Sequence, residues 1–501
     1  MLKTGREFLE GLKDGRLVYV GGERVDDITA HPGFRGAAMS LAALYDWKAD
    51  PAQRGVLSFA EDGGDHSMWF LRPRSREDLT RRMRAHKLIA DFSFGLFGRA
   101  PDHTGSTLTG LAMAPSVFDR IDPRFGANIV GHYEHSRRND IFAAYAIIPP
   151  PGARDPEFHA RSGKPTPGLR VVDERDDGVV ISGMKMLATG AVYADEIWIG
   201  NAHPVPPSQT MEAITCAVPC NVPGLSLWSR KPFAAELSDP FDYPLAARFD
   251  ESDAIVMCDR VFVPWERVFV HRDTEMTRHI YQQTPGQCLG NHQSNVRFWA
   301  KMGILCGVLS RVAKASGTDR IPAIADMLGR IASYEALIGG LVHGQIDACE
   351  NWPGGPEGYV CFNRRIMYAA LNWCTESHGA IIELLRELTG GSIFQMPADV
   401  SVLQNEELAR KFDAHWWSAN ASARERMKLY RLAWDLVGSE FGGRHLQYEK
   451  FYSGPGVVVR GHSLREAPWQ HFDAAVERAF ALQDDSELDS PALRSPLPDP
   501  W

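Results

Sequence analysis

Arg99 and His103 stand four residues apart in the stretch GRAPDHTGS, directly after the aromatic run DFSFGLFG. A helix would bring this fixed cation and this imidazole onto one face, because residues four apart are neighbours on a helix surface. Pro101 lies between them and is tolerated in a turn or in the first turn of a helix. The stretch therefore indicates either a surface turn or the rim of a site that binds an anion.

A second imidazole, His292, lies in the stretch GNHQSNVRF, at the start of a predicted helix. A neutral imidazole in such a place can act as a base or as a hydrogen-bond partner. A histidine that caps the helix or faces solvent is the alternative. The residues of this stretch alone leave both interpretations open.

Two glycine-containing stretches favour close contact with a flat polar ligand. In ISGMKMLATG, Thr189 and Gly190 follow an apolar strand, so a hydroxyl and backbone N–H groups become available there. In SEFGGRH, Gly442 and Gly443 permit close backbone approach, and Arg444 can pair with a phosphate or with a flavin carbonyl. The alternatives are a capped strand turn at the first stretch and a turn that ends a long helix at the second.

Three regions must position these residues. Residues 1–139 are predicted to be mostly helical, residues 140–282 carry short β-branched runs split by Gly, Pro and Asp, and residues 283–480 return to long amphipathic helices. An acidic, Pro-rich tail follows over residues 481–501. We therefore predict a mainly α chain with an N-terminal helical domain, a middle β-barrel and a C-terminal four-helix bundle. This is the layout of the acyl-CoA dehydrogenase-like fold.

Composition and charge argue against several classes of protein. The 501 residues carry a formal net charge of −9, which argues against nucleic acid as a partner. The sequence contains no apolar run of about 18 residues, so it predicts no membrane-spanning helix. The charged N-terminus does not resemble a signal peptide, and the eight cysteines form no four-ligand metal set. We expect a cytoplasmic protein with reduced thiols and no metal.

Several nucleotide and catalytic motifs are missing from the sequence. No G-x-G-x-x-G follows a predicted strand, and the chain has no P-loop, no G-x-S-x-G elbow and no H-E-x-x-H. A redox enzyme of this kind is not expected to bind NAD(P)H through a standard site. Its reducing power must then arrive by another route.

The chain resembles the oxygenase component of the two-component 4-hydroxyphenylacetate 3-hydroxylase family. The segments that carry the resemblance run almost end to end and include GRAPDHTG, AIIPPPG, ISGMKMLATG, YPLAARFDESDAIVMCDRVFVPWE and WDLVGSEFGGRHLQYEKFYSG. The resemblance implies a homotetramer that takes FADH2 (or FMNH2) from a separate NAD(P)H:flavin reductase. It also implies O2 as co-substrate and hydroxylation of a phenol through a flavin hydroperoxide.

The resemblance also implies roles for individual residues. Arg99 matches the family arginine that contacts the phenolic oxygen, where a guanidinium would stabilise the phenolate. His103 and Tyr145 fall where the hydroxyphenylacetate enzymes usually have Tyr and His, which predicts a different phenol. His292 is similar to the histidine of the chlorophenol and nitrophenol branch that is placed to deprotonate the phenol. We therefore expect His292 or His103 to take the phenol proton.

For the flavin, the resemblance implicates one loop, one strand end and one turn: Pro151, Gly152, Ala153, Arg154, Thr189, Gly190, Phe441, Gly442, Gly443 and Arg444. For the substrate, it adds His203 and Pro204 in the loop NAHPV.

Three other functions remain as alternatives. One is a flavin-dependent dehydrogenase of the same fold that holds oxidised FAD tightly, and another is a non-catalytic flavin carrier. A 4-hydroxybutyryl-CoA dehydratase-like enzyme would need an iron–sulfur cluster held by three Cys and a His. Here the first cysteine is Cys216, and the position seven after His292 is Trp299, so that ligand set is missing.

Overall fold

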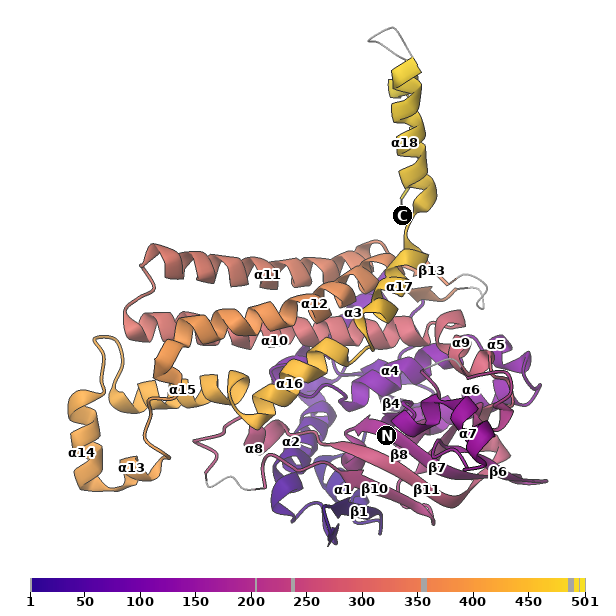
Figure 1. The fold of residues 1–501 in the computed structure, drawn as a ribbon, viewed down its shortest axis with the longest axis horizontal. Coiled ribbons are helices and arrows are strands. Elements are labelled where there is room, and N and C mark those ends of the chain that lie inside the picture. The colour runs from indigo at the N-terminus through magenta and orange to yellow at the C-terminus, as the bar shows by residue number, and fades with distance from the viewer. Residues whose placement is uncertain are drawn as a thin grey trace.

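The computed structural model describes residues 2–202, 205–235, 239–352, 358–484, 491–494 and 496–500. Figure 1 shows the long C-terminal helices lying above the N-terminal helices and the β domain, with the last helix projecting away from the body. This is the predicted order of helices, strands and helices. None of the described helices combines the length and the hydropathy needed to cross a membrane.

The N-terminal region consists of six helices and two short hairpins. Its helices are α1 (Gly5–Gly11), α2 (Pro32–Ala49), α3 (Arg76–Phe92), α4 (Pro101–Ala112), α5 (Ser116–Asp119) and α6 (Phe125–Asn139). Its strands are β1 (Leu17–Val20), β2 (Glu23–Val25), β3 (Ser58–Glu61) and β4 (Gly64–Ser67).

Helix α4 answers the question raised by Pro101. Pro101 is the first residue of α4, where its missing N–H costs no hydrogen bond, so the stretch is the first turn of a helix. Arg99 lies just before this helix, and His103 lies within its first turn. Every residue of α4 is buried, so its polar side chains must find partners inside the protein.

The β domain contains two sheets. The six-stranded sheet has the order β2-β1-β10-β11-β7-β6, and the four-stranded sheet has the order β12-β9-β8-β5. The strands added here are β5 (Ala143–Ala146), β6 (Arg170–Arg175), β7 (Gly178–Thr189), β8 (Glu196–Ile199), β9 (Ile214–Pro219), β10 (Leu225–Ser229), β11 (Asp253–Pro264) and β12 (Val268–His271). Short helices α7 (Pro156–Ser162), α8 (Ala246–Phe249) and α9 (Met276–Gln283) connect or follow them.

The hairpin β1–β2 extends the six-stranded sheet, although the sequence predicts residues 1–139 to be mostly helical. β1 pairs in parallel with β10, with Leu17 opposite Ser226. The stretch LVYVGGERV carries the Gly-Gly signal of a two-residue hairpin turn, and the two strands pair across it. The N-terminal region therefore shares a sheet with the β domain.

The C-terminal region is built around α10 (Gly286–Ser316), α11 (Pro322–Asp347), α12 (Arg364–Thr389) and α15 (Ala423–Val437). These four helices pack against one another and form the predicted bundle. The remaining elements are β13 (Glu350–Asn351), β14 (Val360–Cys361), α13 (Ser401–Gln404), α14 (Glu406–His415), α16 (Glu440–Phe451), α17 (Gly456–Glu466) and α18 (Trp469–Asp484).

The turn predicted over residues 441–444 is wrong, because these residues open helix α16. Ser439 caps this helix, since its hydroxyl accepts a hydrogen bond from the N–H of Gly442 at 3.1 Å. A Cβ at Gly442 would lie 2.6 Å from the carbonyl oxygen of Leu436. The glycine is therefore needed for close packing of the two consecutive helices α15 and α16.

A buried carboxylate, Asp435, links α15 to α8. Its Oδ2 accepts hydrogen bonds from the backbone N–H groups of Leu245 at 2.7 Å and Ala246 at 2.9 Å. Burial outweighs these bonds and raises the pKa of Asp435 to about 6. The folded protein therefore binds a proton here more tightly than the unfolded chain does.

This raised pKa predicts a pH-dependent stability. The contribution of Asp435 is fully present below the ordinary carboxyl pKa and is lost as the pH rises through about 6. We expect Asp435→Asn to raise the free energy of unfolding by about 1–3 kcal/mol at about pH 8 and to have a smaller effect at about pH 5. Thermal melts at both values test this, with the exposed Asp413→Asn as the matched control. An equal gain at the two pH values would contradict it.

Candidate active site

Arg99 and His103 are in direct contact. A guanidinium nitrogen of Arg99 hydrogen-bonds Nε2 of His103, and the other terminal nitrogen donates to the carbonyl oxygen of Tyr452 at 2.8 Å. Because an arginine can only donate, Nε2 must accept, which requires a neutral imidazole. Burial, helped by the charge of Arg99, holds the pKa of His103 well below its usual value. The site thus pairs a half-buried cation with a neutral base.

Tyr145 completes the wall beside His103. The two rings meet edge to face, with their centroids 5.6 Å apart. Burial raises the pKa of Tyr145 above its usual value, so its phenol stays protonated and is available as a donor or acceptor. The structure therefore brings together three of the predicted substrate residues, Arg99, His103 and Tyr145.

Two carboxylates, Glu251 and Asp253, join Arg99 to the predicted flavin residues. Glu251 accepts from the backbone N–H of Arg99 at 2.9 Å and from Nη1 of Arg444 at 2.7 Å. Asp253 accepts from the hydroxyl of Thr189 at 2.6 Å and from Nη2 of Arg444 at 2.7 Å. Three distant segments of the chain thus meet in one buried network.

Arg444 is held entirely by these carboxylates. Each of its three guanidinium nitrogens donates to Glu251 or Asp253. Its charge keeps the pKa of Asp253 far below the usual range, against the effect of burial. In this structure Arg444 therefore orients the two acids, and a direct contact with a flavin stays a prediction.

The backbone next to Thr189 has an unusual conformation. Gly190 has a φ of +76°, and a Cβ there would lie 3.3 Å from the ring of Phe142. Leu187, two residues before Thr189, has a φ of +60° and is 63% exposed. A left-handed, exposed leucine is rare and marks a strained position, which is typical of functional sites. Leu187 is absent from the residues predicted from the sequence.

These features fit a flavin, whose ring system is flat with polar edges. The uncovered side chain of Leu187 offers an apolar surface. Gly443 adds open space, because a Cβ at that position would meet nothing within 4 Å. The hydroxyl groups of Tyr448 and Tyr452 are buried without a hydrogen-bond partner among the described residues. The residues present can therefore hold such a group.

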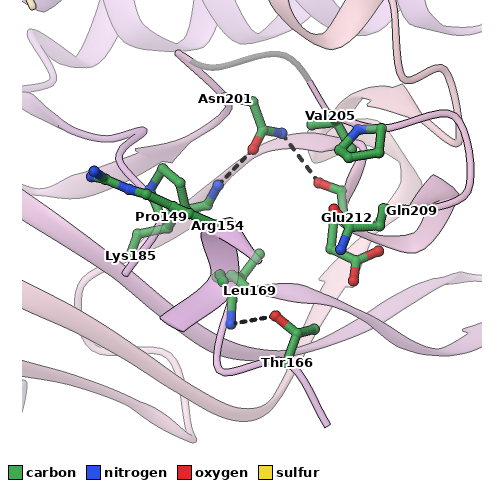
Figure 2. Close-up of a pocket in the computed structure, with 12 residues that line it drawn as sticks. Pro149, Arg154, Thr166, Leu169, Lys185, Asn201, Val205, Gln209 and Glu212 are labelled. Carbon is green, nitrogen blue, oxygen red and sulfur yellow. Dashed lines mark hydrogen bonds between the residues drawn. The ribbon is translucent and has the colours of Figure 1, made fainter. Parts of the chain in front are cut away.

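The remaining predicted flavin residues form the loop Pro151–Arg154, which follows β5. This loop forms a 3₁₀ turn. It reaches β7 through the bridge between Ile148 and Met186, where the N–H of Met186 donates to the carbonyl oxygen of Ile148 at 2.8 Å. Ala153 and Arg154 line a cavity there (Figure 2). The flavin role of this loop stays a prediction.

No hydrogen bond or ring contact joins His292 to Arg99 or His103 among the described residues, and its ring lies 6.5 Å from that of His86. On α10, Gly290 packs against Thr107, since a Cβ there would lie 2.3 Å from its hydroxyl. Two residues later the helix has turned by about 200°. His292 accordingly stacks on Phe362 with ring centroids 3.4 Å apart, and its Nδ1 hydrogen-bonds the side-chain oxygen of Gln345 at 2.8 Å. It is completely buried, and burial holds its pKa well below the usual value.

Two predicted substrate residues, His203 and Pro204, lie outside the described residues. Asn201, two residues before His203, and Val205, directly after Pro204, line the cavity of Figure 2.

Comparisons with known proteins agree with this fold. The family described as 4-hydroxyphenylacetate 3-hydroxylase matches with its N-terminal part over residues 4–270 and with its C-terminal part over residues 277–481. The pyoverdin chromophore biosynthetic protein PvcC of Pseudomonas aeruginosa is 32% identical over 96% of both chains. The oxygenase component of 4-nitrophenol 2-monooxygenase from Rhodococcus is 31% identical over 97% of this chain and 92% of its own length.

A solved structure shows the same likeness in three dimensions. It is the oxygenase component of 4-hydroxyphenylacetate 3-monooxygenase complexed with FAD and 4-hydroxyphenylacetate. It superposes with a TM-score of 0.89 at 29% identity and covers 96% of this chain and 99% of its own. The fold, the site and these similarities define a flavin-dependent phenol monooxygenase with the acyl-CoA dehydrogenase-like fold. The chain belongs to the 4-hydroxyphenylacetate 3-hydroxylase family.

Proposed function

We propose that this chain hydroxylates a phenol as the oxygenase component of a two-component system, with Arg99 binding the phenolate oxygen and His103 accepting the phenol proton. The observation that carries the proposal is the hydrogen bond from Arg99 to Nε2 of a neutral His103. A phenol oxygen that displaces this bond and takes over the guanidinium donor lies beside the Nε2 lone pair that it frees, and that lone pair can accept the phenol proton. The phenol oxygen would then contact both its cationic ligand, Arg99, and its base, His103.

His103 and Arg99 have different roles in the proposed reaction. Proton transfer to His103 produces a phenolate, whose charge the guanidinium of Arg99 stabilises in a site largely shielded from water. The phenolate ring is more electron-rich than the phenol and is the form that attacks an electrophilic oxygen. Reduced FAD, when bound, supplies the electrons that activate O2 for this attack.

Glu251 and Arg444 act through Arg99. Glu251 binds the backbone N–H of Arg99, and Arg444 in turn binds Glu251. The second acid, Asp253, ties the same arginine to Thr189 beside the proposed flavin surface. We infer that this network keeps the phenolate oxygen and the flavin in fixed relative positions, which favours productive transfer over release of H2O2.

A direct assay tests the function. Chemically reduced FAD, O2 and a panel of phenols are mixed with the protein, and products are scored by mass together with released H2O2. We expect a gain of one oxygen atom in at least one phenol, with no other protein needed when FADH2 is supplied. A protein that purifies with tightly bound oxidised FAD and oxidises no phenol would favour the dehydrogenase alternative.

The partners follow from the same proposal. A separate NAD(P)H:flavin reductase delivers FADH2, and the chain works in the cytoplasm, where such reductases find NAD(P)H.

A homotetramer is supported by α18, which projects from the body in Figure 1. One face of this helix carries exposed apolar side chains at helical spacing, namely Trp469, Phe472, Val476 and Phe480. Such an uncovered stripe is typical of a protein–protein contact.

We therefore expect Phe472→Glu combined with Phe480→Glu to dissociate the tetramer. Buried carboxylates at these positions would lose their hydration on assembly. Light scattering tests this, because each chain has a mass of 55.7 kDa and the expected wild-type mass is about four times larger. Asp473→Lys, a charge change next to the stripe, is the control. An unchanged mass for the double variant would contradict the role of α18.

A further inference from the structure

A buried carboxylate, Glu449 on α16, binds two cations that come from α10. Arg297 donates from both terminal nitrogens to the two carboxylate oxygens, at 2.6 and 2.7 Å. Lys301, about one turn further along α10, hydrogen-bonds one of the same oxygens. None of the three side chains is more than 2% exposed. Two buried positive charges therefore share one negative charge.

The surroundings of this cluster leave the extra positive charge in place. The described ion pairs of Arg297 and Lys301 involve Glu449 alone. Burial, helped by the adjacent cations, holds the pKa of His378 and of His445 below the usual value, so both imidazoles are neutral at neutral pH. The other charged or titratable groups around the cluster are Arg444, Tyr448 and Tyr452 from the α16 segment and Cys374 from α12. Of these, the arginine already binds two carboxylates of its own, and burial keeps the two phenols and the thiol protonated.

Lys301 is the member of the cluster that the pairing of charges does not require. Because Arg297 already binds both oxygens of Glu449, the lysine buries one charge more than the pair can balance. Burial lowers the pKa of Lys301 to about 8, against the effect of Glu449, so the ammonium is charged at neutral pH and loses its charge at alkaline pH. An unbalanced buried charge is unfavourable by itself, and it is suited to a site where an anion forms or binds.

The ring of Tyr452 joins this cluster to Arg99. The guanidinium carbons of Arg297 and Arg99 each lie 5.5 Å from the centre of this ring. A second connection runs through Gly95, four residues before Arg99, whose carbonyl oxygen accepts from Arg297 at 2.9 Å. The same glycine packs closely on Lys301, since a Cβ there would lie 2.8 Å from the backbone nitrogen of the lysine. The cluster and the proposed phenolate ligand therefore belong to one packed unit.

The charge of the cluster acts on the imidazole of the proposed site. The pKa of His103 is lowered by burial, by Arg99 and then by Arg297. A positive charge that disfavours a proton on this histidine also favours the loss of a proton from a phenol at the same place. At an effective dielectric constant of about 20, one charge at about 10–13 Å changes a pKa by about 1. The cluster can therefore affect the ionisation of a bound phenol without touching it.

We propose that Lys301 supplies the excess positive charge of this cluster and thereby favours the ionised form of a phenol bound at Arg99. This inference rests on the proposed function and adds a residue that acts on the same site. No contact joins Lys301 to Arg99 or His103 among the described residues, so the ammonium acts by its charge. Glu449 holds the ammonium in place, and Arg297 and Tyr452 form the packed connection to Arg99.

The ionisation of bound 4-nitrophenol tests this proposal without flavin or turnover. The phenolate form of this probe absorbs visible light, so a pH titration of the complex gives the pKa of the bound phenol. We expect Lys301→Met to raise that pKa by about 0.5–1. Lys301→Arg, which keeps the charge, should restore most of the wild-type value. Lys314→Met removes an exposed charge from the same helix and is the matched control.

The methionine variant should fold, because Arg297 remains paired with Glu449. If it does not fold, Lys301→Gln removes the same charge and can still donate a hydrogen bond to Glu449. An equal pKa of the bound probe in the wild type and in the folded Lys301 variant would overturn the proposal. An equal change in Lys314→Met would also overturn it, because the effect would then not depend on the buried position.

Arg99→Ala separates this inference from the proposed function. Weaker binding of the probe by Arg99→Ala, with an unchanged pKa in Lys301→Met, would reject the role of Lys301 and leave that of Arg99 standing. A raised pKa in Lys301→Met, in a protein that binds the probe through Arg99 but hydroxylates no phenol, would support Lys301 although the proposed activity has failed. Equal binding by Arg99→Ala and the wild type, or no binding by either, would overturn both.

Discussion

Arg99→Ala is expected to lower kcat/KM for coupled hydroxylation by about 10²- to 10³-fold. The substitution removes the donor to the phenolate oxygen, whereas Glu251 keeps its bond to the backbone N–H of residue 99. Since Arg99 lowers the pKa of His103, its removal also leaves the histidine easier to protonate. Steady-state kinetics with FADH2 and O2, with product and H2O2 measured together, provide the test.

Two further variants separate charge from geometry at this position. Arg99→Lys keeps the charge but has a single ammonium instead of a fork, so we expect an intermediate loss. Arg84→Ala, on the exposed side of α3, should behave like the wild type. Unchanged coupled hydroxylation in Arg99→Ala would show that Arg99 is not the phenolate ligand.

His103→Asn is expected to slow the hydroxylation of an un-ionised phenol by about 10²-fold near neutral pH. The loss should shrink for 4-nitrophenol, which is largely ionised there and needs no base. It should also shrink as the pH rises towards the pKa of the phenol, because solvent then removes the proton. Rate measurements over pH for the two phenols check both expectations.

His292→Asn provides the comparison, because the sequence leaves either histidine as the base. His292 is stacked on Phe362 and bonded to Gln345, and neither contact involves Arg99. We therefore expect reduced stability and little change in the dependence on phenol ionisation. The opposite pattern, with ionisation-dependent loss in His292→Asn and none in His103→Asn, would assign the base to His292.

The burial of His103 determines how the stability of the protein changes at acid pH. His103 has a folded pKa well below its unfolded value, so the folded protein binds fewer protons than the unfolded chain as the pH falls. The stability contribution of His103 is therefore present above the ordinary histidine pKa and decreases as the pH falls below it, whereas the folded protein keeps the imidazole neutral to a lower pH. His103→Asn should weaken this acid dependence.

Much of the site follows from local sequence. Pro101 restricts the stretch to a turn or to the first turn of a helix, and the structure shows the helix, with Arg99 and His103 in contact. Thr189 and Gly190 stand at a strand end, as their sequence predicts. In both cases the deciding interactions lie within a few residues.

The rest depends on contacts between distant segments. Glu251 and Asp253 belong to the short acidic stretch ESD, which by itself predicts no function. Their shared partner, Arg444 on α16, lies nearly 200 residues further along the chain, so the contact cannot be predicted from local sequence. The contacts of His292 with Phe362 and Gln345 depend on which face of α10 meets α4.

Single-turnover hydroxylation under oxygen-18 tests the central claim most directly. The wild type, mixed with chemically reduced FAD and the best phenol of the panel, should give a product that carries one labelled oxygen atom. Arg99→Ala should consume the same O2 but release it mainly as labelled H2O2. Product without label, or equal labelled product from Arg99→Ala, would contradict the account.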